Sequence, residues 1–128
     1  MSGRKITYLT DVALITCIVQ RGNGDTIVKA AQNAGAQGAT VYYAKGGGIR
    51  ERLGVVGVAV EVEKEVVNII VSTDQKDQVF NSIYLAGQLD TPGMGIAFIT
   101  PLDKAATYVP PDVLKRLGSE SNEAASDV

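Results

Sequence analysis

The feature that most constrains the fold is a continuous apolar run, VALITCIV, at residues 12–19. Its length and its β-branched residues favour a strand that is buried on both faces. A second apolar run, from Val66 to Val71, ends the stretch VGVAVEVEKEVVNIIVS at residues 56–72. This stretch alternates before the run, so it predicts one strand or two. The charged residues ahead of the run are expected at a solvated edge or turn; they are Glu61, Glu63, Lys64 and Glu65.

Two helical segments separate the strands. The first follows QRGNG at residues 20–24, with Asp25 as its N-cap and Gly35 as its C-terminal stop. The second is capped by Ser72 or Asp74, and its apolar residues recur at helical spacing. We therefore expect two amphipathic helices, each placed between two strands.

Further strands are expected in GATVYYA at residues 38–44 and in GMGIAFITP at 93–101, with a short one in ATYV at 106–109. The order of elements is then β-α-β, a loop, and β-α-β again. Two such halves make the split βαβ arrangement. The sequence therefore predicts an α+β protein with a ferredoxin-like βαββαβ sandwich.

The 128 residues suit a single domain with a two-layer core. We assign residues 1–11 to an N-terminal extension and 12–109 to the folded domain. Residues 110–117, PPDVLKRL, have the proline-first signature of a short C-terminal helix. Residues 118–128 are small and polar, so this tail is expected to be disordered.

Composition excludes several classes of site. Twelve basic and fourteen acidic residues give a net charge of -2, so the chain has no general attraction to nucleic acid. Cys17 is the only cysteine and there is no histidine. A disulfide framework is therefore excluded, and a Cys/His zinc site lacks ligands. Cys17 sits in the apolar run, where a structural thiol is the favoured interpretation.

Catalysis and membrane insertion also lack support in the sequence. No histidine can act as a general base, and the acidic residues fall on capping or surface positions, so an enzyme is not expected. The start, MSGRKITYLTD, lacks the apolar core of a signal peptide, and no apolar run approaches the ~20 residues that span a bilayer. We expect a cytoplasmic protein that reaches a membrane only through a protein partner.

Two glycine clusters have ordinary explanations beside a ligand-binding one. GNGDTI at residues 22–27 follows a strand, as a dinucleotide fingerprint does, but Ile27 stands where a third glycine is needed. A tight turn into the helix, capped by Asp25, explains it better. TPGMGIAF at 91–98 is a weak signal alone, because a helix-to-strand connection also uses glycines at positive φ.

The third cluster lies in YYAKGGGIRERLGVVG at residues 42–57 and leaves two interpretations open. Gly46, Gly47 and Gly48 lack the Gly-Lys-Ser/Thr ending of a P-loop. Their backbone N–H groups, with charge from Arg50 and Arg52, could still hold an anion. A flexible hairpin tip explains the same residues equally well.

Taken together, AQGATVYYAKGGG and SIYLAGQLDTPGMGIAFIT resemble the PII family of trimeric signalling proteins over residues 12–109. In that family a ligand-responsive T-loop contacts a partner, while a B-loop and a neighbouring subunit's C-terminal loop hold an adenine nucleotide. The resemblance implies a homotrimer with nucleotide sites between protomers and a membrane transporter as partner. It assigns nucleotide binding to Thr40, Gly46, Gly47, Gly48, Arg50, Gly93, Met94, Gly95 and Lys104, and partner binding to Arg50, Glu51, Arg52 and Leu53.

The chain departs from the family pattern where phosphate charge is neutralised. The family's B-loop usually reads Gly-Asp-Gly-Lys, and this chain has GMGI at residues 93–96. Thr107 and Val109 stand where the C-terminal loop of the family carries arginines. With this charge missing, we expect ADP or AMP, or a small anion, in preference to ATP. No cofactor and no metal is required.

The loop itself departs from the nitrogen-regulating members. It is several residues shorter, and no tyrosine for uridylylation lies between Gly46 and Val66. Arg50 falls near the position of the glutamine that helps to place magnesium and 2-oxoglutarate. Control by uridylylation and the usual sensing of 2-oxoglutarate are therefore not expected.

Two functions from other classes compete with this resemblance. A trimeric metal-tolerance or structural protein like CutA shares the ferredoxin-like architecture, but the lone Cys17 and the absence of histidine argue against it. A small enzyme that uses the arginines of the loop for an anionic substrate ranks last, because the chain offers no base.

Overall fold

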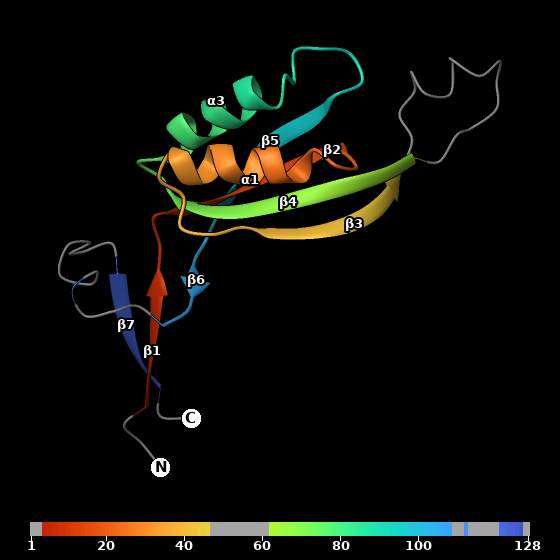
Figure 1. Cartoon of the computed structure of the whole chain (residues 1–128). Helices are drawn as coiled ribbons and strands as arrows, with labels where there is room; N and C mark the ends of the chain where they lie inside the picture. The colour runs from red at the N-terminus through yellow and green to blue at the C-terminus, as the bar shows by residue number, and fades with distance from the viewer. Residues whose placement is uncertain (1–3, 47–61, 109–111, 113–120, 127–128) are drawn as a thin grey trace.

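The computed structural model describes residues 4–46, 62–108, 112 and 121–126 (Figure 1). The elements, in chain order, are β1 (Arg4–Leu9), β2 (Val12–Gln20), α1 (Gly24–Asn33), β3 (Thr40–Gly46), β4 (Val62–Ser72), α3 (Lys76–Ala86), β5 (Gly95–Leu102), β6 (Ala105–Ala106) and β7 (Ser121–Ser126). Within these ranges no helix is long and apolar enough to cross a membrane.

The main sheet has four strands in the order β3-β4-β2-β5, and each neighbouring pair is antiparallel. This order follows from two βαβ halves whose strands interleave. Both helices, α1 and α3, cover the same face of the sheet (Figure 1). The structure therefore confirms the α+β, ferredoxin-like arrangement expected from the sequence.

The core lies between this sheet and the two helices. Alternate residues of β2 and β4 point to the helices, and Ile27 and Ala31 of α1 meet them with Val79 and Ile83 of α3. The strand residues of the core are Ala13, Ile15, Cys17, Val19, Val67, Ile69 and Val71. Cys17 is fully buried, and desolvation raises its pKa to about 11. This thiol stays protonated and acts as a packing group, as expected.

The other face of the sheet is open in the single chain. Register places Tyr42, Val66, Ile18 and Ile96 in one row across this face. Ile96 is 57% exposed, and Ile70 on the same face is 53% exposed. The run at residues 12–19 was expected to be buried on both faces, and each of its residues is buried or half-buried. The exposed apolar side chains of this face lie on the other strands, β3, β4 and β5. The open face keeps apolar side chains that nothing within the described chain covers.

A second, three-stranded sheet has the order β6-β1-β7. β1 pairs with β7 from Arg4↔Ser126 to Leu9↔Ser121, and with β6 at Tyr8↔Ala106. This sheet stands away from the main sheet (Figure 1). The expectation of disorder over 118–128 is therefore wrong for Ser121–Ser126, because main-chain hydrogen bonds to a neighbouring strand do not need apolar side chains. Of the helix expected at 110–117, only Asp112 lies within the described residues.

The helix starts differ from the expected caps. α1 begins at Gly24 after Asn23, and Asp25 lies inside its first turn, where it pairs with Lys29 at 3.2 Å. α3 is preceded by Gln75 instead of Ser72 or Asp74, and neither helix has a side-chain capping bond. Asn23 and Gln75 already have nearly helical backbone angles. α1 therefore begins before Asp25, and α3 begins after Ser72 and Asp74. Gly35 does follow α1 at φ +114°, as expected of a stop.

The charged stretch ahead of Val66 was also misassigned. Glu63, Lys64 and Glu65 belong to β4, and Glu65 is only 8% exposed. The strand begins at Val62, so Glu61 lies outside the described residues. Glu65 faces the helices with Val67, and its carboxylate has a backbone partner there, which is why the strand can continue through a charged residue.

Candidate functional site

The strand ends define two ends of the main sheet. At the loop end β3 finishes at Gly46 and β4 begins at Val62, which register pairs directly. β2 also finishes there, and β5 begins opposite Val19 at Gly95. At the far end β2 begins opposite Ser72. The loop end therefore gathers described residues of all three glycine clusters that were considered as ligand sites: Gly22 and Gly24 after β2, Gly46, and Gly93–Gly95.

The glycine turn, Gly93–Gly95, is shaped by its backbone. Gly93 has φ +85° and Gly95 has φ +141°, conformations that residues with a Cβ rarely adopt. A Cβ on Gly95 would collide with the carbonyl oxygen of Ile18. Gln20 holds the turn from the side, because its Nε2 donates to the carbonyl oxygen of Gly93 at 2.7 Å. The turn thus presents main-chain groups, and Met94 supplies no charge.

The other predicted ligand residues are spread over the sheet. Gly46 shares the loop end with the glycine turn, but β4 and β2 lie between them. Thr40 lies mid-sheet, opposite Asn68, where it lines a shallow hollow with Gly38. Lys104 follows β5 at the far end, and its Nζ lies 4.7 Å from the ring centre of Tyr8. One protomer therefore brings Gly46 and the glycine turn to one end and leaves Thr40 and Lys104 elsewhere.

Several predicted residues lie outside the described chain. They are Gly47, Gly48, Arg50, Glu51, Arg52 and Leu53. Their assignments to nucleotide and partner binding stay predictions.

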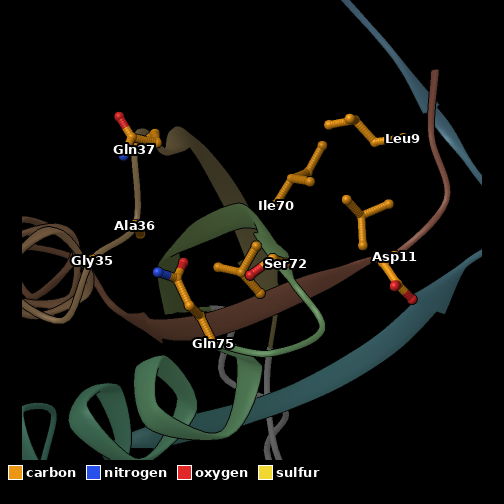
Figure 2. Close-up of a pocket in the computed structure, with 10 residues that line it drawn as sticks. Leu9, Asp11, Gly35, Ala36, Gln37, Ile70, Ser72 and Gln75 are labelled. Carbon is orange, nitrogen blue, oxygen red and sulfur yellow. The ribbon is translucent and has the colours of Figure 1, made fainter. Parts of the chain in front are cut away.

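A cavity of about 360 Å³ opens at the far end of the sheet (Figure 2). Its apolar wall includes Leu9 from β1 and Ile70 from β4, and Ile70 also borders the hollow at Thr40. Polar groups come from Asp11, Gln37, Ser72 and Gln75. Figure 2 shows the Gln75 amide directed toward Gly35. Apolar walls with a few polar groups are the usual lining of a small-molecule site.

The sequence prediction missed this cavity. Ser72 was taken as a capping candidate, and Gln37 was part of AQGATV without a role of its own. Leu9 lies in the segment assigned to an extension. The only sequence signal was proximity in the chain, since Gln37 is three residues before Thr40. The cavity exists because the segment after α1 meets the end of β4, a long-range contact that no local pattern predicts.

The first glycine cluster is a tight turn and not a phosphate site. Gly22 has φ +98°, and the N–H of Gly24 donates to Oε1 of Glu65 at 2.6 Å. A Cβ on Gly24 would collide with that same oxygen. The start of α1, which would have to bind phosphate in a dinucleotide fold, already holds a carboxylate. The interpretation as a turn is confirmed, apart from the cap at Asp25.

Charge at the loop end is arranged in pairs. The guanidinium of Arg21 forms an ion pair with Glu63 and lies 6.0 Å from the ring centre of Tyr43. Lys64 stands in the same row as Gln20 and Ala44, with β2 between it and the glycine turn. Among the residues that the structure describes, no group of three His, Cys, Asp or Glu residues is placed to hold a metal ion.

Comparison with known proteins identifies the family. No curated protein matches the chain. Among solved structures, the fold is similar to that of Arabidopsis thaliana PII bound to citrate, with a TM-score of 0.59 and 23% identity over 73% of this chain and 79% of that one. The family described as nitrogen regulatory protein P-II matches residues 12–109. The chain therefore belongs to the nitrogen regulatory protein P-II family.

Proposed function

We propose that this P-II family regulator is a homotrimer that binds an adenine nucleotide between protomers and controls a partner through the loop between β3 and β4. The observation that carries the proposal is the separation of the candidate ligand surfaces. The glycine turn lies at the loop end, whereas Thr40 and the cavity with Gln37 lie toward the far end. In the proposed trimer, a neighbouring protomer brings the two surfaces together.

A cyclic trimer supplies such a junction. Its interface is heterologous, so each protomer presents one surface to its neighbour and a different surface to the other neighbour. The open, apolar sheet face gives the reason to assemble, since Ile70, Ile96 and Phe98 are between 43% and 57% exposed. Closing three such faces around an axis removes them from water.

The ligand chemistry follows from what each surface offers. The glycine turn would offer main-chain N–H groups to phosphate or carboxylate oxygens, although the N–H of Met94 donates to the carbonyl oxygen of Thr91 at 3.2 Å in the ligand-free chain. The cavity has apolar walls for a planar base and amide groups for its polar edge. The Arabidopsis protein binds citrate, which supports an anion on this fold. Because the glycine turn carries no basic side chain, ADP or AMP should bind more tightly than ATP.

The partner assignment rests on the family. The loop residues Arg50, Glu51, Arg52 and Leu53 would contact it, and a membrane transporter is the partner that the resemblance implies. The protein would then work in the cytoplasm and reach the membrane only through that partner. A regulator that passes on its ligand state needs no catalytic group.

Calorimetric titration tests the proposed function. ATP, ADP, AMP and cyclic AMP are titrated into the purified protein, with and without magnesium or bicarbonate. We expect saturable binding with one site per protomer, and ADP or AMP should be tighter than ATP. Tighter binding of ATP, strengthened by magnesium, would contradict the argument from missing charge. No binding of any adenine nucleotide would remove the nucleotide from the proposal.

A further inference from the structure

One short turn contacts both the glycine turn and the strand that leads out of the loop. It runs from Gln20 to Gly24, between β2 and α1. We propose that this turn couples the two regions, with Arg21, Glu63 and Glu65 as positioning residues. Its consequence for ligand sensing rests on the proposed function, but the coupling itself is a property of the ligand-free protein.

The first contact reaches β5. The side-chain amide of Gln20 donates to the carbonyl oxygen of Gly93 at 2.7 Å. Gly93 is held at positive φ, so its carbonyl direction depends on that backbone conformation. Any ligand that reorients the glycine turn must change this hydrogen bond.

The second contact reaches β4 through a buried carboxylate. Glu65 is 8% exposed, and its Oε1 accepts the N–H of Gly24 at 2.6 Å. The bond is short and charge-assisted, and it is shielded from water, so it is the stronger of the contacts. A Cβ on Gly24 would meet the carboxylate, so a larger residue here would force the Glu65 side chain to shift. The turn and β4 are fitted to one another at this point.

A third contact, made by the side chain of Arg21, connects the turn with β3 as well. Arg21 pairs with Glu63 and lies over the ring of Tyr43. Both charged side chains are more than half exposed, so this pair alone is weak. The Arg21–Glu63 pair matters because of where it lies. Glu63 is the partner of Lys45 in the strand register, one residue from where both strands enter the loop. Arg21 therefore links both strands of the loop to the turn.

The sheet order shows why such a link is needed. β5 and β3 are the two edge strands, with β2 and β4 between them. A change at the glycine turn would otherwise reach β3 only across two intervening strands. The turn at 20–24 connects β5 directly with β4 and β3. A ligand that alters the Gln20–Gly93 bond therefore also alters the contacts that the turn makes with Glu65 and Glu63.

Amide hydrogen exchange on the ligand-free full chain tests the coupling. Gln20→Ala removes only the contact to Gly93, and Arg21→Gln removes only the contacts to Glu63 and Tyr43. We expect Gln20→Ala to speed exchange at residues 44–46 and 62–65, and Arg21→Gln to speed it at 93–95, each by roughly three- to tenfold. The matched control is Asp25→Asn, which removes an exposed ion pair within α1.

Effects confined to each variant's own contact would overturn the coupling, and so would an equal effect of the control. Glu65→Gln and Glu65→Ala give a second comparison. The glutamine keeps an oxygen acceptor for Gly24 and should preserve the wild-type exchange pattern at 44–46, whereas alanine should lose it. If Glu65→Ala does not fold, the two surface variants still decide the matter.

Nucleotide titration of the same variants separates this inference from the proposed function. If the wild type binds no nucleotide, the proposed function fails while the exchange result stands. If it binds, Arg21→Gln should alter the affinity although Arg21 lies outside the glycine turn, and Asp25→Asn should leave it unchanged. Unchanged affinity in Arg21→Gln, together with unchanged exchange at 93–95, would show that the turn does not couple the two regions.

Discussion

Two side chains with titratable groups, Cys17 and Glu65, lie in the interior of this domain. Cys17 has no polar partner among the described residues to stabilise a thiolate, and burial raises its pKa. Glu65 differs, because the N–H of Gly24 meets its carboxylate. A buried polar group is tolerated when it is hydrogen-bonded, and a buried thiol is tolerated as a small apolar group. Cys17 therefore serves packing, and Glu65 serves the connection between a helix and a strand.

The buried thiol should make stability fall at alkaline pH. Its pKa rises from the ordinary 9.0 to about 11 on folding. Below pH 9 both states keep the proton. Between about 9 and 11 the unfolded chain loses it first, so the free energy of unfolding falls, by about 2–3 kcal/mol at the upper limit.

Denaturant unfolding at pH 8 to 11 should show this slope in the wild type, and Cys17→Ala should flatten it while lowering stability throughout. Other groups titrate in this range, so the difference between the two proteins is the measurement. Equal slopes in both would contradict the argument from burial.

At the scale of elements, the period of the apolar residues predicted the strands of the main sheet and both helices. β2 and the buried half of β4 were found because Val12–Val19 and Val66–Val71 are strongly apolar. Element boundaries were less accurate. Glu65 was read as solvated because a single charged residue does not reveal a partner 41 positions away. Its place two residues before the buried Val67 was the available signal for its orientation.

The candidate site was predictable in part for the same reason. Gly93 and Gly95 stand out locally, and their positive φ values agree with that signal. Gln20, whose amide holds the turn, lies 73 positions away and carries no pattern of its own. β7 was missed because Asn, Glu and Ala are depleted in strands, so composition predicted disorder instead.

The two sheets should respond separately to loss of β7. Among the described strands it pairs with β1 alone, and its main-chain bonds cover one edge of β1. In a chain truncated after residue 120, the β1 amides at Ile6–Tyr8 should exchange roughly tenfold faster or more, because β1 loses its strand hydrogen bonds to β7. Amides of β2 and β4 should keep their wild-type rates. Slower or unchanged exchange in β1, or faster exchange in β2, would contradict a separate β6-β1-β7 sheet.

At the scale of the whole molecule, one face of the protomer's main sheet is covered and the other is open. The helices cover one side of the main sheet, and the other side keeps Tyr42, Ile70, Ile96 and Phe98 between 43% and 57% exposed. The candidate ligand surfaces are similarly divided between the loop end and the far end. Assembly would cover the open face and bring the two ligand surfaces together. A variant that no longer forms the trimer should therefore also lose ligand binding.

A charged residue placed on the open face tests whether the protein assembles as a trimer or stays a monomer. Phe98→Glu places a carboxylate where the trimer would bury apolar groups, and an unpaired buried charge costs several kcal/mol. Light scattering should therefore show a trimer for the wild type and a monomer for Phe98→Glu, and nucleotide titration should show that the monomer has lost binding. The matched control is Leu85→Glu on α3, because Leu85 is 71% exposed and lies on a helix, away from the open face. This variant should remain trimeric and bind as the wild type does. A monomeric wild type at micromolar concentration would refute the assembly, whereas a Phe98→Glu monomer that still binds nucleotide would place the ligand within one protomer.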